Sequence, residues 1–186
     1  MDSLKLLVTH RGRLLSKYGA DGVAAIEEAV SRLAAADETR GIKTRYVCLD
    51  DAEEMKSLGS RSVLPNPSAA SCKKAIDRII TRHPADYLVL LGADDVIPHF
   101  RVPNPTHAEE GDPEEEVPTD NPYASSVSFN EKSRATWLVP DRAIGRIPDV
   151  PGAGDLTGLL NYLGSAASSE PQDLTEFDVD LLVRCD

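Results

Sequence analysis

The fold class of this chain is decided by the stretch Asp86-Tyr87-Leu88-Val89-Leu90-Leu91-Gly92. Its apolar residues follow one another without a polar interruption, and a glycine ends the run. Continuous apolar runs of this length are typical of strands covered on both faces, as the strands of parallel sheets are. We therefore predict a buried strand here, inside a parallel sheet.

Alternating patterns upstream of this strand extend the prediction to a whole sheet. Short apolar runs at Leu4–Thr9 and Thr44–Leu49 predict two further strands. Apolar residues at helical spacing lie between the predicted strands: Val23, Ile26, Val30, Leu33, Cys72, Ile76, Ile79 and Ile80. The first helix is expected to begin at Asp21, and residues 52–67 are expected to form a loop. This order predicts an α/β fold, a three-layer sandwich with helices on both faces of a mainly parallel sheet.

An acidic, proline-rich segment, residues 101–122, interrupts the alternation. Such a composition cannot bury much apolar surface, so we expect an exposed, mobile loop. A divalent-cation site or a substrate-gating loop is the alternative for this segment. Tyr123–Phe129 and Thr136–Val139 then predict two short strands, which would form a small antiparallel hairpin.

The remainder of the chain predicts the end of one unit and the beginning of another. Ala143–Pro148 is a short extended segment, and leucines at helical spacing follow a boundary at Pro151-Gly152. Phe177–Cys185 has the pattern of a last strand. We therefore expect an α/β unit over residues 1–150. A connecting helix and the first strand of a second subdomain are expected over residues 151–186.

Composition limits the partners and the location of the chain, which has 186 residues and a formal net charge of −11. Lys and Arg do not cluster along the sequence, so nucleic acid and anionic membrane surfaces are not expected as partners. No stretch is long and apolar enough to span a bilayer, and the N-terminus lacks the pattern of a signal peptide. A cytoplasmic location is the resulting expectation.

Acidic residues follow two of the predicted strands. Asp50 and Asp51 come after the second strand, and Asp94 and Asp95 come after the strand at 86–92. Ligands of open α/β sheets bind beyond the carboxyl ends of the strands, where paired carboxylates can hold Mg²⁺ or Ca²⁺. Asp50, Asp94 and Asp95 are therefore the candidate cation site, as in a receiver-like or phosphatase-like protein. The alternative is that these acids only stabilise loops and helix starts.

Cysteine and histidine give weaker indications of chemistry. Cys48 and Cys72 lie in a strand pattern and a helix pattern, and we expect buried structural thiols at both positions. His10 follows the first strand and would need a nucleophile beside it. A dyad of His10 with Cys48 lacks the flanking glycines that would admit a substrate. His99 and His107 are expected to point into solvent.

Three segments of the sequence form a pattern through their order and spacing. Ala85–Pro98 reads ADYLVLLGADDVIP, Pro118–Ala124 reads PTDNPYA, and Pro140–Pro148 reads PDRAIGRIP. In combination they resemble the gingipain family of cysteine peptidases. Within these segments Asp120, Asp141 and Arg146 are expected to form an ion network that ties the hairpin to the sheet.

The resemblance implies a caspase-like architecture built from two similar α/β halves. In that family the second half carries a catalytic His, which precedes a Gly, and a nucleophilic Cys at the ends of later strands. Neither catalytic segment is found in this sequence, and Cys185 comes too early to be the family's nucleophile. The resemblance therefore assigns no catalytic residue here. It implies two partners, a catalytic subdomain outside this chain and the protein substrate of the parent peptidase.

Three functions remain open at this point. The first is the non-catalytic N-terminal part of a gingipain-like cysteine endopeptidase, in which a Cys/His dyad outside this chain does the proteolysis. The second is a free-standing, non-enzymatic α/β interaction module. The third is a cation-dependent protein with an acid pocket at Asp50, Asp94 and Asp95. No cofactor is expected for the first two functions, whereas the third requires a divalent cation such as Mg²⁺ or Ca²⁺.

Overall fold

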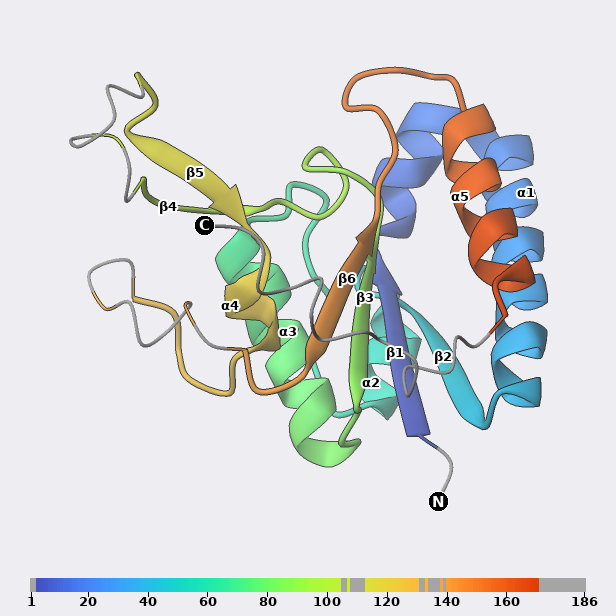
Figure 1. Ribbon diagram of the computed structural model, residues 1–186, viewed down its shortest axis with the longest axis horizontal. Coiled ribbons are helices and arrows are strands. Elements are labelled where there is room, and N and C mark those ends of the chain that lie inside the picture. The colour runs from blue at the N-terminus through green and yellow to red at the C-terminus, as the bar shows by residue number, and fades with distance from the viewer. Residues whose placement is uncertain are drawn as a thin grey trace, which may run out of the picture.

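The computed structural model describes residues 3–104, 107, 113–130, 133, 138 and 140–170. Its centre is a four-stranded sheet in the order β2-β1-β3-β6 (Figure 1). The strands are β1 (Ser3–Thr9), β2 (Ile42–Cys48), β3 (Tyr87–Leu91) and β6 (Ala143–Ile147). All three pairings are parallel, and β3 lies between β1 and β6. This arrangement confirms the predicted α/β fold with a mainly parallel sheet.

Helices cover both faces of the sheet and complete the three layers (Figure 1). The helices on one face are α1 (Arg11–Thr39) and α5 (Thr157–Ser168), and those on the other are α2 (Ala52–Ser57) and α3 (Ala69–Arg82). The core forms where the inner helix faces meet the sheet. It contains side chains that are almost completely buried from each layer: Leu88, Leu90, Leu91, Ile26, Leu33, Ile76, Ile79, Leu159 and Leu163.

Helix α1 begins ten residues earlier than Asp21, the predicted start. His10 is its N-cap, and the imidazole Nδ1 accepts a hydrogen bond from the Arg13 N–H at 3.3 Å. Gly19 then adopts a φ of 68°, which interrupts the helix and which other residues rarely tolerate. The sequence prediction missed this start for two reasons. The residues before Asp21 lack a clear apolar periodicity, and the helix is capped by a histidine rather than by the usual Ser or Asp.

Two segments that were predicted to be loops contain regular structure. Residues 52–67 include α2, whose N-cap Asp51 accepts the Glu54 N–H at 2.9 Å. The acidic segment at 101–122 includes most of a second, antiparallel sheet made of β4 (Phe100–Pro103) and β5 (Glu116–Thr119). Phe100 and Val102 are buried while the residues between and after them are exposed, so β4 has the alternation of a half-buried strand.

The small antiparallel pair was therefore predicted in the wrong place. Tyr123 and Ala124 belong to a short helix, α4 (Asn121–Ala124), rather than to a strand. Pro122 favours this helical turn, since its fixed φ suits the first residues of a helix. Most of the second predicted strand, Thr136–Val139, lies outside the described residues, as does all of Phe177–Cys185.

Helix α5 matches the predicted leucine helix and packs along α1 (Figure 1). Arg40, which follows α1, donates hydrogen bonds to the carbonyl oxygens of Ala166 at 3.1 Å and Ala167 at 2.7 Å. These bonds satisfy carbonyls that the last turn of α5 leaves without a partner in the helix. Among the described residues, no helix has both the length and the apolar character needed to cross a membrane.

Candidate functional site

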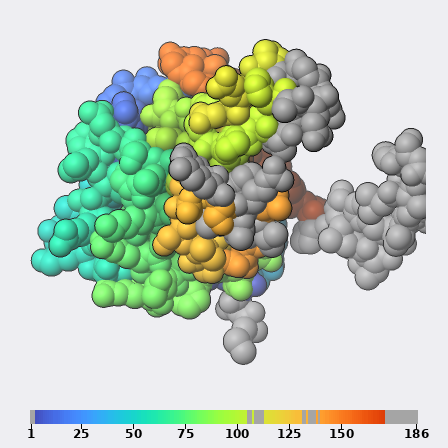
Figure 2. All heavy atoms as spheres, turned by 90° about the vertical axis from the view of Figure 1, so that its left-hand side faces the viewer, coloured from blue at the N-terminus to red at the C-terminus, as the bar shows by residue number. Residues whose placement is uncertain are grey.

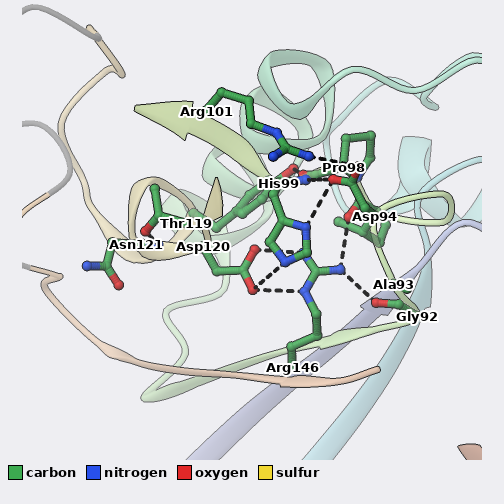
Figure 3. Close-up of polar contacts among 12 residues, drawn as sticks. Gly92, Ala93, Asp94, Pro98, His99, Arg101, Thr119, Asp120, Asn121 and Arg146 are labelled. Carbon is green, nitrogen blue, oxygen red and sulfur yellow. Dashed lines mark hydrogen bonds and ion pairs between the residues drawn. The ribbon is translucent and has the colours of Figure 1, made fainter. Parts of the chain in front are cut away.

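A cluster of charged side chains lies beyond the carboxyl ends of β3 and β6 (Figure 3). Its centre is Arg146, whose side chain is only 9% exposed. The guanidinium makes a bidentate pair with Asp120, with Nε to Oδ2 at 2.8 Å and Nη2 to Oδ1 at 2.6 Å. Its Nη1 donates to the carbonyl oxygens of Gly92 at 2.6 Å and Ile97 at 2.9 Å. The planar fork of an arginine is what permits four such contacts at once.

His99 lies between two carboxylates of the same cluster (Figure 3). Its backbone N–H donates to Asp94 Oδ1 at 2.6 Å, and the ring Nδ1 lies 3.0 Å from the same oxygen. The ring Nε2 faces Asp120 Oδ2 at 3.7 Å. The prediction that His99 points into solvent was therefore wrong. We call Asp94, His99, Arg101, Asp120 and Arg146 the Arg146 cluster.

The electrostatic state of Asp94 follows from these contacts. Partial burial would raise the pKa of this carboxyl, but the hydrogen bonds from His99 and the charge of Arg101 lower the pKa below its usual value. Arg101 Nη2 lies 3.5 Å from Asp94 Oδ2. The carboxylate is thus held in its charged form, as an anchor for the chain that leads into β4.

The three segments that resemble the gingipain family meet at the Arg146 cluster. Arg146 comes from the third segment, Asp120 from the second, and the carbonyl groups of Gly92 and Ile97 from the first. A second link joins the first two segments, since the Tyr123 hydroxyl donates to the Pro98 carbonyl oxygen at 2.5 Å. Residues that are far apart in the sequence therefore form one interacting unit.

The glycine in the first segment has a steric explanation. Gly92 adopts a φ of 111°, a conformation that side chains disfavour. A Cβ atom at this position would lie 2.6 Å from the Cβ of Val96. The turn after β3 can consequently be this tight only with glycine, and the tight turn presents the Gly92 carbonyl to Arg146.

A second ionic cluster holds the opposite side of the same turn. Lys17 Nζ lies 2.6 Å from Asp149 Oδ2 and 2.9 Å from Asp95 Oδ2, and it also donates to the Val150 carbonyl oxygen at 2.7 Å. The Tyr18 hydroxyl donates to Asp149, and the Ala93 N–H donates to Asp149 Oδ1 at 2.5 Å. We call Lys17, Tyr18, Asp95 and Asp149 the Lys17 cluster. Sequence reasoning found only Asp95 of this set.

The pKa values of Lys17 and Asp95 are shifted in the directions that keep both side chains charged. Burial would lower the pKa of Lys17, yet its hydrogen bonds to Asp149 and Asp95 raise the pKa overall. Burial would raise the pKa of Asp95, but the N–H of Gly152 and the ammonium of Lys17 lower it. Burial and the hydrogen bond to Asp149 raise the pKa of Tyr18, so this hydroxyl stays protonated. These shifts favour the ion pairs that hold the turn, and the raised pKa makes the Tyr18 hydroxyl a poor nucleophile at neutral pH.

The remaining predicted site residues take different partners. Asp141 lies apart from the pair of Asp120 and Arg146 and accepts the backbone N–H of Ser126. Asp50 accepts the N–H groups of Arg11 and Gly12, both at 2.7 Å, at the start of α1. Carboxylates favour this position because of the positive end of the helix dipole.

The three carboxylates of the candidate cation site therefore have separate environments. Asp50 caps α1, Asp94 belongs to the Arg146 cluster, and Asp95 belongs to the Lys17 cluster. In the part of the chain that the structure describes, no group of three or more His, Cys, Asp or Glu side chains could hold a metal ion.

The two described cysteines are free, buried thiols. Burial raises the pKa of Cys48 to about 11 and that of Cys72 to about 12. The ring nitrogens of the buried His10 face other groups, because Nε2 lies 3.0 Å from the Leu64 carbonyl oxygen and Nδ1 accepts the Arg13 N–H. A thiol with so high a pKa is a poor nucleophile at neutral pH. This environment argues against a dyad of His10 and Cys48.

Comparisons of the chain with protein-family profiles, with curated proteins and with solved structures each found no match. The geometry of the site and the resemblance of the three segments are therefore the grounds for a functional proposal.

Proposed function

We propose that this chain is the non-catalytic N-terminal part of a gingipain-like cysteine endopeptidase. Its role is to support a catalytic subdomain that lies outside this chain and carries the Cys/His dyad. The observation that carries the proposal is the Arg146 cluster. This cluster joins the three segments of the resemblance to one another. Their spacing along the chain alone does not require them to meet.

The open margin of the sheet supports a role beside a second subdomain. Among the described strands, β6 pairs only with β3 and lies at the end of the strand order. Ala143 and Gly145 of β6 are exposed. An unpaired strand margin is a ready template for further pairing or packing. Arg146 of β6 ties this margin to the β3 turn through its hydrogen bond to the Gly92 carbonyl oxygen.

The environments of the described cysteines support a dyad located elsewhere. Cysteine peptidases attack the peptide carbonyl with a thiolate while a histidine serves as the base, and an acyl-enzyme forms. Cys48 and Cys72 are buried, with thiol pKa values raised to about 11 and about 12. Neither side chain offers a thiolate to a protein substrate. We also propose a cytoplasmic location, since a reducing compartment would preserve these free thiols.

Two measurements test this proposal. Incubation of the chain with a mixture of fluorogenic peptides should give no turnover, whereas turnover that is lost in Cys48→Ser would contradict the proposal. The reading frame downstream of Asp186 should encode a His-Gly pair and a later Cys. A frame that stops at Asp186 would instead favour a free-standing interaction module, for which the open β6 margin would serve as the binding surface.

A further inference from the structure

A basic hollow lies between α3 and the loop that precedes it. Its volume is about 330 Å³, and its lining includes the cations Arg61, Lys74 and Arg78. The other lining residues are apolar or neutral, so no carboxylate lines the hollow. This grouping is unexpected in a chain of net charge −11. The sequence shows the spacing of Lys74 and Arg78, but it could not place Arg61 of the preceding loop beside them. We call this cavity, with its three cations Arg61, Lys74 and Arg78, the basic hollow.

The cations of the basic hollow lack intramolecular partners. Within the described part of the chain, the side chains of Arg61, Lys74 and Arg78 form no ion pair and no hydrogen bond, and the Arg61 carbonyl oxygen alone accepts a bond from the Ser60 hydroxyl. The neighbouring Lys73 shows the contrast, since its Nζ lies 3.0 Å from Asp77 and donates to the Ser125 carbonyl oxygen at 2.8 Å. All three cations of the hollow are exposed. Their charges are therefore available to a ligand.

The spacing along α3 selects an elongated ligand. Lys74, Arg78 and Arg82 follow one another at intervals of four residues, so they lie on one helix face about 6 Å apart. The loop runs beside this face, since a Cβ atom at Gly59 would lie 1.5 Å from Arg82 Nη1. Figure 2 views the molecule from the side on which α3 lies. An extended peptide presents alternate side chains at a matching interval of about 6.6 Å.

An apolar residue adjoins the cations. Leu64 lines the same hollow and is 76% exposed. A peptide can place an apolar side chain on Leu64 while its carboxylates meet the cations. Nucleic acid would gain nothing from the leucine, whereas a peptide can use the cations and the leucine together.

We propose that the basic hollow binds an extended acidic peptide segment of a partner protein, with carboxylates at alternate positions. The carboxylates pair with Lys74, Arg78 and Arg61, and an apolar side chain of the peptide packs on Leu64. This interaction uses α3 and its preceding loop, and it involves no residue of the Arg146 cluster.

Fluorescence anisotropy at low salt tests this proposal with a labelled peptide that has Glu at three successive alternate positions and Leu at the next alternate position, so that all four side chains share one face. Arg78→Glu should weaken binding roughly tenfold or more, because one attractive contact becomes repulsive. The matched control is Lys43→Glu, which reverses an exposed cation on β2 and should change binding less than about twofold. A peptide with Gln in place of Glu should not bind. Higher salt should weaken the binding of the acidic peptide, because salt screens its attraction to the cations.

Several results would overturn the proposal. The first is an absence of peptide binding, and the second is an equal loss in Lys43→Glu and Arg78→Glu. A third is tighter binding of a single-stranded oligonucleotide than of the acidic peptide, which would assign the hollow to nucleic acid. Circular dichroism verifies that each variant is folded. If Arg78→Glu fails to fold, Lys74→Gln and Arg78→Gln take its place with the same expected direction.

Discussion

The two ionic clusters hold opposite sides of one turn but differ in their access to water. In the Lys17 cluster, the side chain of Asp149 is 1% exposed and that of Lys17 is 10% exposed. In the Arg146 cluster, His99 is 23% exposed and Asp94 is 42% exposed. Asp149 receives the Ala93 N–H, while Arg146 donates to the Gly92 carbonyl. Adjacent backbone groups of the same turn are therefore fixed by clusters of different burial.

This difference indicates a division of roles. Buried charges that lose a partner are costly, so the Lys17 cluster should govern whether the sheet and α1 stay together. The Arg146 cluster is more open and joins the turn to β5 through Asp120. It should govern how firmly the antiparallel sheet is attached rather than whether the fold forms.

The largest expected effect is that of Asp149→Ala. This change leaves the Lys17 ammonium, the Tyr18 hydroxyl and the Ala93 N–H without their shared acceptor. We expect a loss of about 3 to 5 kcal/mol in the free energy of unfolding, measured by urea denaturation. The control Glu28→Ala removes an exposed carboxylate from α1 and should cost less than about 0.5 kcal/mol. A cost below about 1 kcal/mol for Asp149→Ala would contradict a structural role for this cluster.

A smaller effect is expected for Arg146→Lys. Lysine keeps the positive charge but cannot make the bidentate pair with Asp120 and the two carbonyl contacts together. The expected loss is about 2 kcal/mol, again measured by denaturant unfolding. Arg101→Lys is the matched control, because Arg101 is exposed and should cost less than about 0.5 kcal/mol. Equal losses in the free energy of unfolding for the two variants would contradict a central role for Arg146 in its cluster.

The smallest expected effect is a difference in how much stability the wild type and Asp95→Asn lose as the pH falls. The folded-state pKa values of Asp94 and Asp95 are lowered, so their contribution to stability is present above the unfolded pKa of about 3.9 and is lost as pH falls through the folded values. Between about pH 5 and pH 2, the wild type should therefore lose more stability than Asp95→Asn. Because Asp95 is partly exposed, solvent screening limits the difference to under about 1 kcal/mol.

Asp94→Asn sharpens this test, since Asp94 is the more exposed of the two carboxyls. Its difference from the wild type should be smaller than that of Asp95→Asn. Equilibrium unfolding at several pH values measures both differences. A wild type that gains stability relative to both variants as the pH falls would refute the sign of these shifts.

Much of the fold could be predicted because it rests on local patterns. The apolar run at 86–92 identified β3, of which Leu88, Leu90 and Leu91 are buried and Val89 is partly buried. The helical spacing of Ile76 and Ile79 identified α3. The strand β4 was missed because proline and acid dominate its surroundings, while only Phe100 and Val102 mark its buried face. Residues 11–20 of α1 were missed because the cap is a histidine and Gly19 interrupts the helix.

The candidate site was harder to predict because its contacts are distant in sequence. Asp120 and Arg146 were singled out from the resemblance, and the structure places them in one ion pair. Nothing in the sequence could pair Lys17 and Tyr18 with Asp149, since more than a hundred residues separate them. His99 was misjudged because no local pattern shows that the chain places its ring between Asp94 and Asp120.

The proposed function is that the α/β unit supports catalysis without supplying the catalytic thiol. Its most direct test is alkylation with iodoacetamide and with a peptidyl acyloxymethyl ketone at neutral pH, followed by peptide mapping. We predict that Cys48 and Cys72 stay unmodified by either reagent in the native protein, and that iodoacetamide modifies both after unfolding, because burial raises their thiol pKa values. Stoichiometric modification of native Cys48 by the ketone, abolished in His10→Ala, would contradict the claim.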